Sequence, residues 1–340
     1  MKGSMDHHTT DVVIIGAGPV GLFAIFECGM MKLKTHVIDT LEEVGGQCTA
    51  LYPEKPIYDI PAHPEILAGE LIDNLKKQAD PFSPTYHLGQ QVTHLEKEDS
   101  GWHIRTSKGV SISCKAVIIA AGVGAFGPNR PPLQHIENYE NKSVFYFVRN
   151  KESFRGKKVV IAGGGDSAVD WALNLVNIAA HVTVVHRRPK FRAAPDNVSK
   201  LQSLEKEGKL DLAIPYQLGS LHGQGSTLHK IGLKSLGGEE KIIEADALLA
   251  FFGLSMNLGP LTEWGLNLEK SHITVDNGTY QTSASGIFAI GDVAIYPHKQ
   301  KLILTGFSEA ASAAHQIRSI VYPKETFHFQ YSTSQGVPGA

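Results

Sequence analysis

Short apolar runs bounded by glycine or polar turns recur along the chain and alternate with segments of helical periodicity. These runs span residues 12–15, 35–38, 158–162 and 181–185. Each is continuous and mostly β-branched, which is typical of a strand buried on both faces of a parallel sheet. Helical patterns follow at 22–30 and 167–178. The alternation predicts an α/β fold built from βαβ units.

The loop after the first strand reads Gly-Ala-Gly-Pro-Val-Gly and places Gly16, Gly18, Pro19 and Gly21 in a G-x-G-x-x-G pattern. The first glycine permits the tight turn, the second lets the backbone approach a pyrophosphate, and the third lets helix and strand pack closely. Asp39 ends the second strand, where an acid accepts hydrogen bonds from a ribose diol. The complete strand, loop, helix, strand and acid predict a dinucleotide-binding unit.

The same pattern returns after residue 157. Gly163 and Gly165 stand in the loop, and Ala168 replaces the third glycine, a tolerated variant. Asp166 and Ser167 open the following helix, whose N-terminus supplies N–H donors to phosphates. The chain therefore contains two dinucleotide-binding units, and we expect residues Gly163 to Ser167 to contact the second nucleotide.

The two units differ at the end of their second strand. In each, 23 residues separate the first glycine from this position, which holds Asp39 in the first unit and His186 in the second. Arg187, Arg188 and Arg192 follow His186. An acid suits a free 2′-hydroxyl, whereas a guanidinium can bind a 2′-phosphate in a bidentate way. The cluster therefore favours NADPH, although a solvated charge run on a surface loop is the alternative.

Near the C-terminus, an apolar strand at 286–290 is followed by Asp292, and a helix is expected over 304–320. An acid in this place can bind a polyol such as the ribityl chain of a flavin, and the helix dipole can stabilise negative charge on a reduced flavin. The alternative for Asp292 is a plain turn residue. These observations assign FAD to the first unit and NADPH to the second.

The C-terminal strand and helix are expected to complete the first nucleotide unit. The predicted architecture is thus two Rossmann-like domains, with the NADPH domain inserted into the FAD domain. The expected FAD-binding domain comprises residues 1–124 and 285–340, and the NADPH-binding domain residues 125–284. The middle of the chain predicts a helix that opens at Pro64 and a β-hairpin that turns at Lys108 and Gly109.

Composition narrows the functional classes. The chain has 340 residues, a length that favours two domains. Its net charge of −2 excludes a strong electrostatic attraction to nucleic acid or anionic membranes. No apolar run approaches the roughly 18 residues of a membrane span, and no secretory signal is expected. The three cysteines, Cys28, Cys48 and Cys114, form no C-x-x-C pair and suit a reducing cytoplasm. No metal site is expected.

The motifs "GAGPVG", "GGQ", "GGGDSA", "HRRPKFR" and "GIFAIGD" together resemble the thioredoxin reductase lineage of flavoproteins over nearly the whole chain. Thioredoxin reductases carry a C-x-x-C near the NADPH unit, and this chain has none, so disulfide exchange lacks its nucleophile. A disulfide reductase of the lipoamide dehydrogenase type would have a second cysteine five residues after Cys48, where Pro53 stands. The resemblance therefore concerns fold rather than disulfide chemistry.

The segments "GGQCTALYPEKPIYDIPAHP" and "FHFQYSTS" are similar to the ferredoxin–NADP⁺ reductases of thioredoxin reductase type. The resemblance implies that Tyr52 and Tyr331 stack on the two faces of the isoalloxazine and that Thr333 contacts the flavin. The further FAD contacts that it implies are Asp39, Gln47, Val92, Phe126 and Asp292. It also implies a homodimer. Without the resemblance, both tyrosines would be read as ordinary core or surface residues.

The function expected from these observations is electron transfer between NADPH and ferredoxin or flavodoxin, by hydride transfer to flavin N5 followed by single-electron steps. No general acid, nucleophile or metal is required. One alternative is an NADPH-dependent flavin oxidase or diaphorase that uses oxygen or free flavin. A non-catalytic redox sensor is the alternative from another class. A Baeyer–Villiger monooxygenase would need a fingerprint that the chain lacks.

Overall fold

The computed structural model describes residues 7–325 and 332–337, and within them the chain divides into two compact units. The first unit comprises Met1–Phe126 and Met256–Ala340, and the second comprises Gly127–Ser255. The α/β class with parallel-strand sheets is confirmed. No helix in the described part of the chain is long and apolar enough to cross a membrane.

The chain crosses between the two units twice, and the second crossing, back into the first unit, lies near residue 255 rather than at the expected 284. The reason is that the intervening segment is packed into the first unit. Its buried side chains belong to the same apolar cluster as Val13 and Val117 of the first unit's sheet. They are Leu258, Leu261, Leu266, Ile273 and Val275. The two crossings, β9 (Ala125–Pro128) and β18 (Leu254–Asn257), pair with each other as a two-stranded ribbon.

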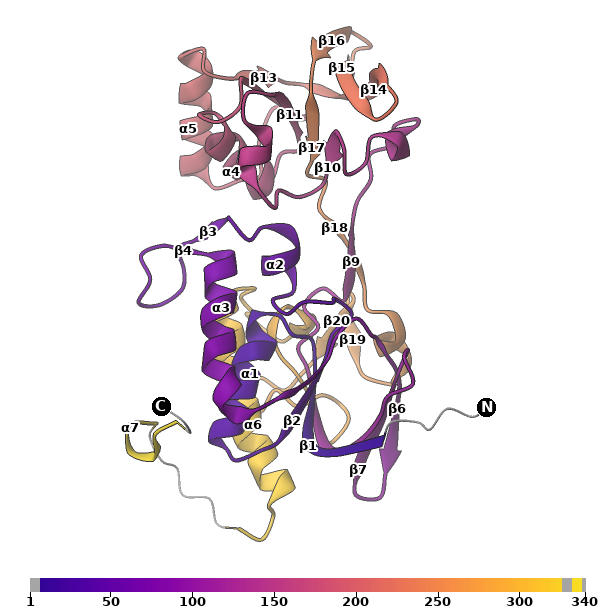
Figure 1. Ribbon diagram of the computed structural model, residues 1–340, viewed down its shortest axis with the longest axis vertical. Helices are drawn as coiled ribbons and strands as arrows, with labels where there is room; N and C mark the ends of the chain where they lie inside the picture. The colour runs from indigo at the N-terminus through magenta and orange to yellow at the C-terminus, as the bar shows by residue number, and fades with distance from the viewer. Residues whose placement is uncertain (1–6, 326–331, 338–340) are drawn as a thin grey trace. The chain divides into compact units, whose positions relative to one another are not determined.

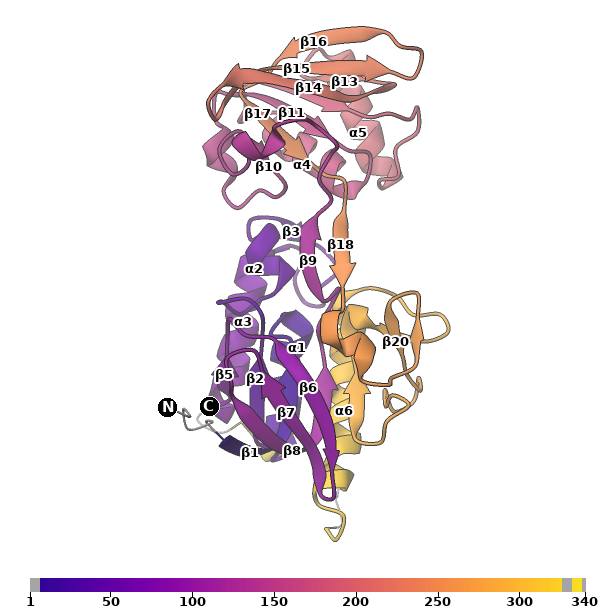
Figure 2. The same ribbon diagram turned by 90° about the vertical axis from the view of Figure 1, so that its right-hand side faces the viewer.

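A seven-stranded sheet forms the frame of the first unit (Figures 1 and 2). Its order is β5-β2-β1-β8-β7-β6, and β21 also pairs with β8. The strands are β1 (His7–Ile15), β2 (Thr35–Ile38), β5 (Thr85–His87), β6 (Val92–Glu98), β7 (Gly101–Thr106), β8 (Ser111–Ile119) and β21 (Ile287–Ala289). The C-terminal strand therefore joins the sheet of the first nucleotide unit, as the sequence predicts.

Strand β8 combines two kinds of pairing. It is antiparallel to β7 from Trp102↔Cys114 to Arg105↔Ser111, which confirms the predicted hairpin, and parallel to β1 along nearly its whole length. Because β1 pairs with both halves, β8 runs unbroken from Ser111 to Ile119.

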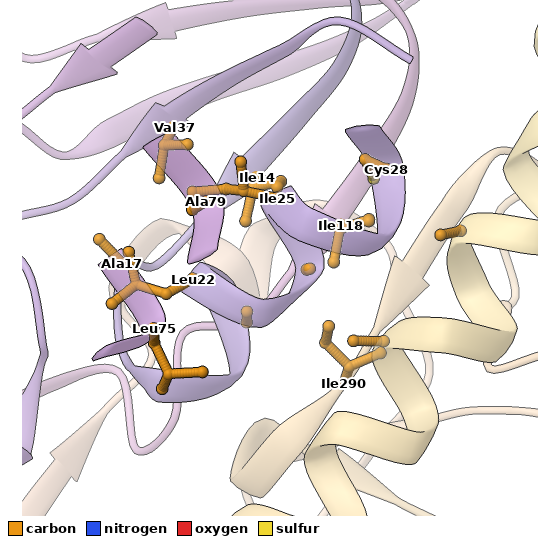
Figure 3. Close-up of a cluster of buried hydrophobic side chains, with 14 of the residues drawn as sticks. Ile14, Ala17, Leu22, Ile25, Cys28, Val37, Leu75, Ala79, Ile118 and Ile290 are labelled. Carbon is orange, nitrogen blue, oxygen red and sulfur yellow. The ribbon is translucent and has the colours of Figure 1, made fainter. Parts of the chain in front are cut away.

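One face of this sheet is covered by α1 (Pro19–Met30), α3 (Ala68–Ala79) and α6 (Ile303–Val321) (Figure 1). Their apolar side chains meet those of the strands in a single core, part of which Figure 3 shows around Ile14, Leu22, Ile25, Leu75 and Ile118. The predicted start of α3 at Pro64 is wrong. Residues 66–67 stay extended as β4 (Ile66–Leu67) because they pair with β3 (Pro56–Ile57).

The other face carries the segment between the second crossing and β21. Two strands of this segment, β19 (Leu268–Glu269) and β20 (His272–Thr274), form a three-stranded sheet with β22 (Ala294–Ile295), which follows β21. Two short helices complete the first unit: α2 (Gln47–Leu51) and α7 (Ser332–Gln335).

The second unit is built on a five-stranded parallel sheet in the order β10-β17-β11-β12-β13. Its strands are β10 (Val144–Phe145), β11 (Lys158–Ala162), β12 (His181–Val185), β13 (Asp211–Ala213) and β17 (Ala247–Ala250). Its helices are α4 (Asp166–Leu175) and α5 (Pro195–Lys206). An antiparallel sheet of β14 (Tyr216–Gln224), β15 (Thr227–Ser235) and β16 (Glu240–Glu244) shares a core with the parallel sheet.

Candidate functional site

A cavity of about 280 Å³ opens in the first unit at the carboxyl ends of β1, β2 and β8. The structure brings together eight of the predicted residues in its wall. They are Gly16, Gly18, Pro19, Asp39, Gln47, Tyr52, Val92 and Asp292. Ligands of open α/β sheets bind at this edge of the strands. The position agrees with a nucleotide site.

The three glycines of the first loop differ in the space around them. Gly16 has φ +110°, and a Cβ there would lie 2.3 Å from the carbonyl oxygen of Ala120. A Cβ on Gly21 would lie 2.0 Å from the carbonyl oxygen of Gly16, so this glycine permits the helix to pack. At Gly18, by contrast, a Cβ would meet no atom within 4 Å. The space beside Gly18 is open to the cavity, and α1 begins directly after it at Pro19.

Asp39 closes the same loop from the end of β2. Its Oδ2 accepts the backbone N–H of Ala17 at 2.6 Å, and its Oδ1 accepts that of Leu41 at 2.8 Å. Burial raises the pKa of this carboxyl above its usual range, and the backbone donors oppose the rise. Each carboxylate oxygen has a further lone pair. Asp39 can therefore still accept hydrogen bonds from a ligand hydroxyl in the cavity.

Cys48 and Tyr52, both in the cavity wall, come from α2 and its C-terminal end. Two positive-φ glycines, Gly45 and Gly46, turn the chain into this helix. The Tyr52 hydroxyl and the Cys48 thiol form a hydrogen bond, and burial raises the pKa of the thiol to about 11. The thiol is therefore protonated near neutral pH and is a poor nucleophile.

The remaining wall comes from the C-terminal part of the first unit. Gly291 and Asp292 lie in a short 3-10 turn after β21, and residues 301–303 lead into α6. The N-terminus of this 19-residue helix borders the cavity, where its unpaired N–H groups and dipole favour negative charge. The predicted helix at 304–320 is confirmed to within one residue at each end.

Several residues of the wall were not predicted from the sequence. These are Gln90, Gln91, Leu258, Leu261, Trp264 and Lys301. Lys301 is held by His272, whose Nε2 lies 2.7 Å from the lysine Nζ. The one available signal was the position of Lys301 just before the predicted C-terminal helix. The others reach the cavity only through tertiary packing.

The part of the chain that the structure describes does not place three of the predicted flavin contacts at the cavity. The backbone of Phe126 belongs to β9, but its side chain lies outside what the structure describes. Tyr331 falls outside the described residues altogether. Thr333 is an exposed residue of α7. Their roles stay predictions.

The glycine loop of the second unit repeats the geometry of the first. A Cβ on Gly163 would lie 2.7 Å from the carbonyl oxygen of Phe251, whereas one on Gly165 would meet no atom within 4 Å. Helix α4 begins directly after Gly165, so Ser167 stands exposed in its first turn. Asp166 has a structural partner, because its Oδ1 accepts the backbone N–H of Ala194 at 2.9 Å.

The cationic cluster lies on the loop after β12. Arg187, Arg188 and Arg192 are exposed, and none of them forms an ion pair with any acidic side chain in the described part of the chain. His186 stacks on Phe191 and donates from Nε2 to the carbonyl oxygen of Lys190 at 3.3 Å. Burial lowers the pKa of His186 and the three arginines lower it further, opposed by the bond to Lys190.

The geometry of both units fits a dinucleotide. Each has a glycine with open space at the start of a helix, Gly18 in one and Gly165 in the other, where backbone N–H groups can meet a pyrophosphate. They differ in charge at the ribose position, where one has a carboxylate and the other has exposed guanidinium groups.

Comparison with known proteins agrees with this geometry. Residues 10–317 match the family described as pyridine nucleotide-disulphide oxidoreductase. The chain is 57% identical over 335 residues to the ferredoxin–NADP reductase of Paramagnetospirillum magneticum, covering 98% of this chain and 99% of that protein. It is 58% identical over 334 residues to the enzyme of that name from Rhodospirillum rubrum, covering 97% of each.

Solved structures show the same architecture. Thioredoxin reductase from Lactococcus lactis has a TM-score of 0.78 at 26% identity and covers 92% of this chain and 99% of its own. Thioredoxin reductase from T. acidophilum has the same TM-score at 25% identity, covering 92% and 98%. Fold and site thus define an oxidoreductase with two dinucleotide-binding domains. The chain belongs to the pyridine nucleotide-disulphide oxidoreductase family, together with the ferredoxin–NADP reductases, and this family depends on FAD and NADP(H).

Proposed function

We propose that this protein is a ferredoxin–NADP⁺ reductase that transfers electrons between NADPH and ferredoxin or flavodoxin through FAD. The observation that carries the proposal is the chemistry of the cavity wall. It combines a dinucleotide loop, an acid and an aromatic side chain with a single thiol, Cys48, which is buried and protonated. The relatives that match over nearly the whole chain bear the name ferredoxin–NADP reductase.

The second unit would bind NADPH. Gly165 and the first turn of α4 offer backbone donors to the pyrophosphate, and Arg187, Arg188 and Arg192 offer guanidinium groups to the 2′-phosphate. Since no acidic side chain in the described residues neutralises these arginines, their charge is available to a ligand. His186 tends toward the neutral form because burial and the arginines lower its pKa. His186 therefore supports the arginine loop and does not add positive charge to it.

The first unit would bind FAD, with Asp39 on the ribose diol, Gln47 and Val92 along the cavity and Asp292 on the ribityl chain. When bound, FAD accepts a hydride from NADPH and releases the two electrons singly. Tyr52 offers an aromatic face in the wall and helps to exclude water. By resemblance, Phe126, Tyr331 and Thr333 would complete the flavin contacts.

The protein's own thiols favour a one-electron acceptor over a disulfide. Cys28, Cys48 and Cys114 are all buried and free, and burial raises the pKa of each. Disulfide exchange requires an accessible thiolate. Electrons from the flavin would therefore pass directly to an external carrier, for which the names of the relatives supply ferredoxin.

We further propose that the protein is a homodimer of the cytoplasm. The homodimer comes from the resemblance to ferredoxin–NADP⁺ reductases of thioredoxin reductase type. Three free thiols and no disulfide among the described residues suit a reducing compartment. Light scattering coupled to size exclusion would test the dimer, because a monomer would elute near the chain mass of 36.9 kDa.

Stopped-flow mixing tests the activity directly. Purified protein is mixed with NADPH to follow loss of the flavin absorbance, and the reduced protein is then mixed with oxidised ferredoxin without oxygen. Fast reduction followed by fast reoxidation is the expected result. Fast reduction with reoxidation by oxygen or free flavin alone would replace the proposal by an oxidase or diaphorase. Slow reaction with every acceptor would indicate a sensor.

A further inference from the structure

A fully buried carboxylate lies behind the flavin cavity and has no place in the function proposed above. Glu309 of α6 is 0% exposed. Its Oε2 accepts the backbone N–H of Gly291 at 2.6 Å. Its Oε1 accepts the hydroxyl of Tyr296 at 2.7 Å and forms an ion pair with Nζ of Lys299, whose side chain is 4% exposed.

The three partners of Glu309 belong to two segments that border the cavity. Gly291 begins the 3-10 turn that carries Asp292 into the cavity wall. Tyr296 and Lys299 belong to the loop that continues through residues 301–303, which also line the cavity, into α6. Glu309 itself lies on α6. One carboxylate therefore joins the Asp292 turn, the loop and the helix.

Packing alone does not call for a charge at this position. Removing a carboxylate and an ammonium from water costs several kcal/mol per ion, and apolar residues of similar volume often replace such a pair without loss. Gly306, three residues earlier on the same helix, faces an apolar group, because a Cβ there would lie 2.3 Å from the Val20 side chain. A buried charge at position 309 is instead suited to fixing geometry, because it accepts from three donors at once.

The N–H of Gly291 explains why an acceptor is needed here. Gly291 is buried, and its N–H points toward α6, where it donates to Glu309. A buried N–H without an acceptor costs about 1–3 kcal/mol. Glu309 supplies this acceptor and thereby sets the distance between the turn and the helix.

We propose that Glu309, paired with Lys299, is a positioning residue for the flavin site. It holds the Asp292 turn and the start of α6 in the arrangement that binds the flavin. The inference rests on the proposed function, because it takes FAD as the ligand of the cavity. It adds a residue that touches no ligand and acts through Gly291, Tyr296 and Lys299.

The test compares FAD binding with folding stability in full-length variants. Glu309→Gln keeps an oxygen for Gly291 but loses the charge, and Glu309→Gln/Lys299→Met also removes the cation left without a counter-ion. FAD affinity is measured from the flavin fluorescence released on dilution of the holoprotein, and Tm is measured by calorimetry. We expect Glu309→Gln to weaken FAD binding about tenfold or more, the scale of a lost hydrogen bond to a charged group. In the double variant, Tm recovers while FAD binding stays weak.

Arg318→Met is the matched control. Arg318 lies at the other end of the same helix, is 9% exposed, and bonds Met31 and Glu325, neither of which lines the cavity. It should lower Tm and leave FAD affinity within about twofold of wild type. The inference is overturned if both Glu309 variants bind FAD like the wild type, or if Arg318→Met, at a similar loss of Tm, weakens FAD binding as much as Glu309→Gln does. A wild-type protein without bound FAD would instead overturn the proposed function.

Discussion

The backbone N–H of Arg192 donates a hydrogen bond of 2.7 Å to the carbonyl oxygen of Gly164. This bond ties the arginine loop to the glycine loop that precedes α4. A second bond, from the Ala194 N–H to Asp166, reinforces it. Both parts of the proposed NADPH site therefore form one piece of structure. Because the Arg192 bond is made by backbone atoms, removal of an arginine side chain leaves it intact and tests charge alone.

Replacement of Arg187 and Arg188 by alanine should impair NADPH much more than NADH. Loss of the charge-assisted hydrogen bonds of both exposed side chains to a 2′-phosphate should cost about 1.5–3 kcal/mol in total, so KM for NADPH should rise about tenfold to a hundredfold. KM for NADH, which lacks this phosphate, should change about twofold or less. Steady-state reduction of ferricyanide with each nucleotide measures both values.

Lys200→Ala is the control for the arginine variants, because Lys200 is an exposed cation on the neighbouring helix α5. It should leave both constants unchanged. An equal rise of KM for NADPH and NADH in the arginine variants would contradict the phosphate role and favour a solvated charge run.

The two glycines of the first loop should respond differently to alanine. At Gly18, a Cβ would enter open space in the cavity, so Gly18→Ala should keep its Tm and weaken FAD binding by about tenfold or more. At Gly21, a Cβ would lie 2.0 Å from the carbonyl oxygen of Gly16, so Gly21→Ala should lose about 1–3 kcal/mol of stability. Calorimetry and FAD titration separate the two. Equal loss of Tm in both would show that the space at Gly18 is not reserved for a ligand.

Strands that are marked by a local hydrophobic pattern could be predicted from the sequence. The strand at 35–38 and the one at 181–185 coincide with β2 and β12, since continuous β-branched runs bounded by turns have few alternatives. The shared register of the two motifs also located the cationic cluster beside the second glycine loop. The hydrogen bond between Arg192 and Gly164 joins the two loops directly in the folded chain.

Features set by tertiary packing were not predictable. Residues 258–275 lack a strong pattern, and only their burial against β1 and β8 assigns them to the first unit. Trp264 and Gln90 reach the cavity for the same reason. Glu309 reads in the sequence as an ordinary polar position on a helix, because its partners are 10 to 18 residues away along the chain.

Replacement of Cys48 by alanine should leave electron transfer nearly unchanged. The thiol is buried with a pKa of about 11, so it is protonated at neutral pH and takes no part in disulfide exchange. The variant should lose about 1 kcal/mol of stability from the small cavity, with kcat for ferredoxin reduction within about twofold. The pH profile of kcat should be the same in both proteins. A hundredfold loss of activity would instead indicate that the Cys48 thiol takes part in electron transfer.

Tyr52 should contribute to FAD binding through its ring rather than its hydroxyl. Tyr52→Ala removes an aromatic face from the cavity wall, and FAD affinity should fall about tenfold, the upper end expected for one aromatic contact. Tyr52→Phe loses only the hydrogen bond to Cys48 and should bind FAD like the wild type. Visible circular dichroism of the flavin should change in the alanine variant alone. Equal effects of the two substitutions would argue against stacking.

The pH dependence of FAD binding should report the ionisation of Asp39. Burial raises the pKa of this carboxyl in the folded protein above its ordinary value, so it takes up a proton at a higher pH than in the unfolded chain. FAD affinity should be constant above the raised pKa and should fall as pH decreases through it, because a protonated carboxyl is a weaker acceptor for the ribose hydroxyls.

Apoprotein stability should change in the opposite direction over the same window. A folded-state pKa above the unfolded value means that the native state binds more protons, so stability falls as pH rises from the unfolded to the folded pKa. Asp39→Asn should abolish both dependences, since the amide does not titrate there. Parallel FAD titrations and urea unfolding across this pH range measure them, and a pH-dependent FAD affinity that persists in Asp39→Asn would assign the effect to another group.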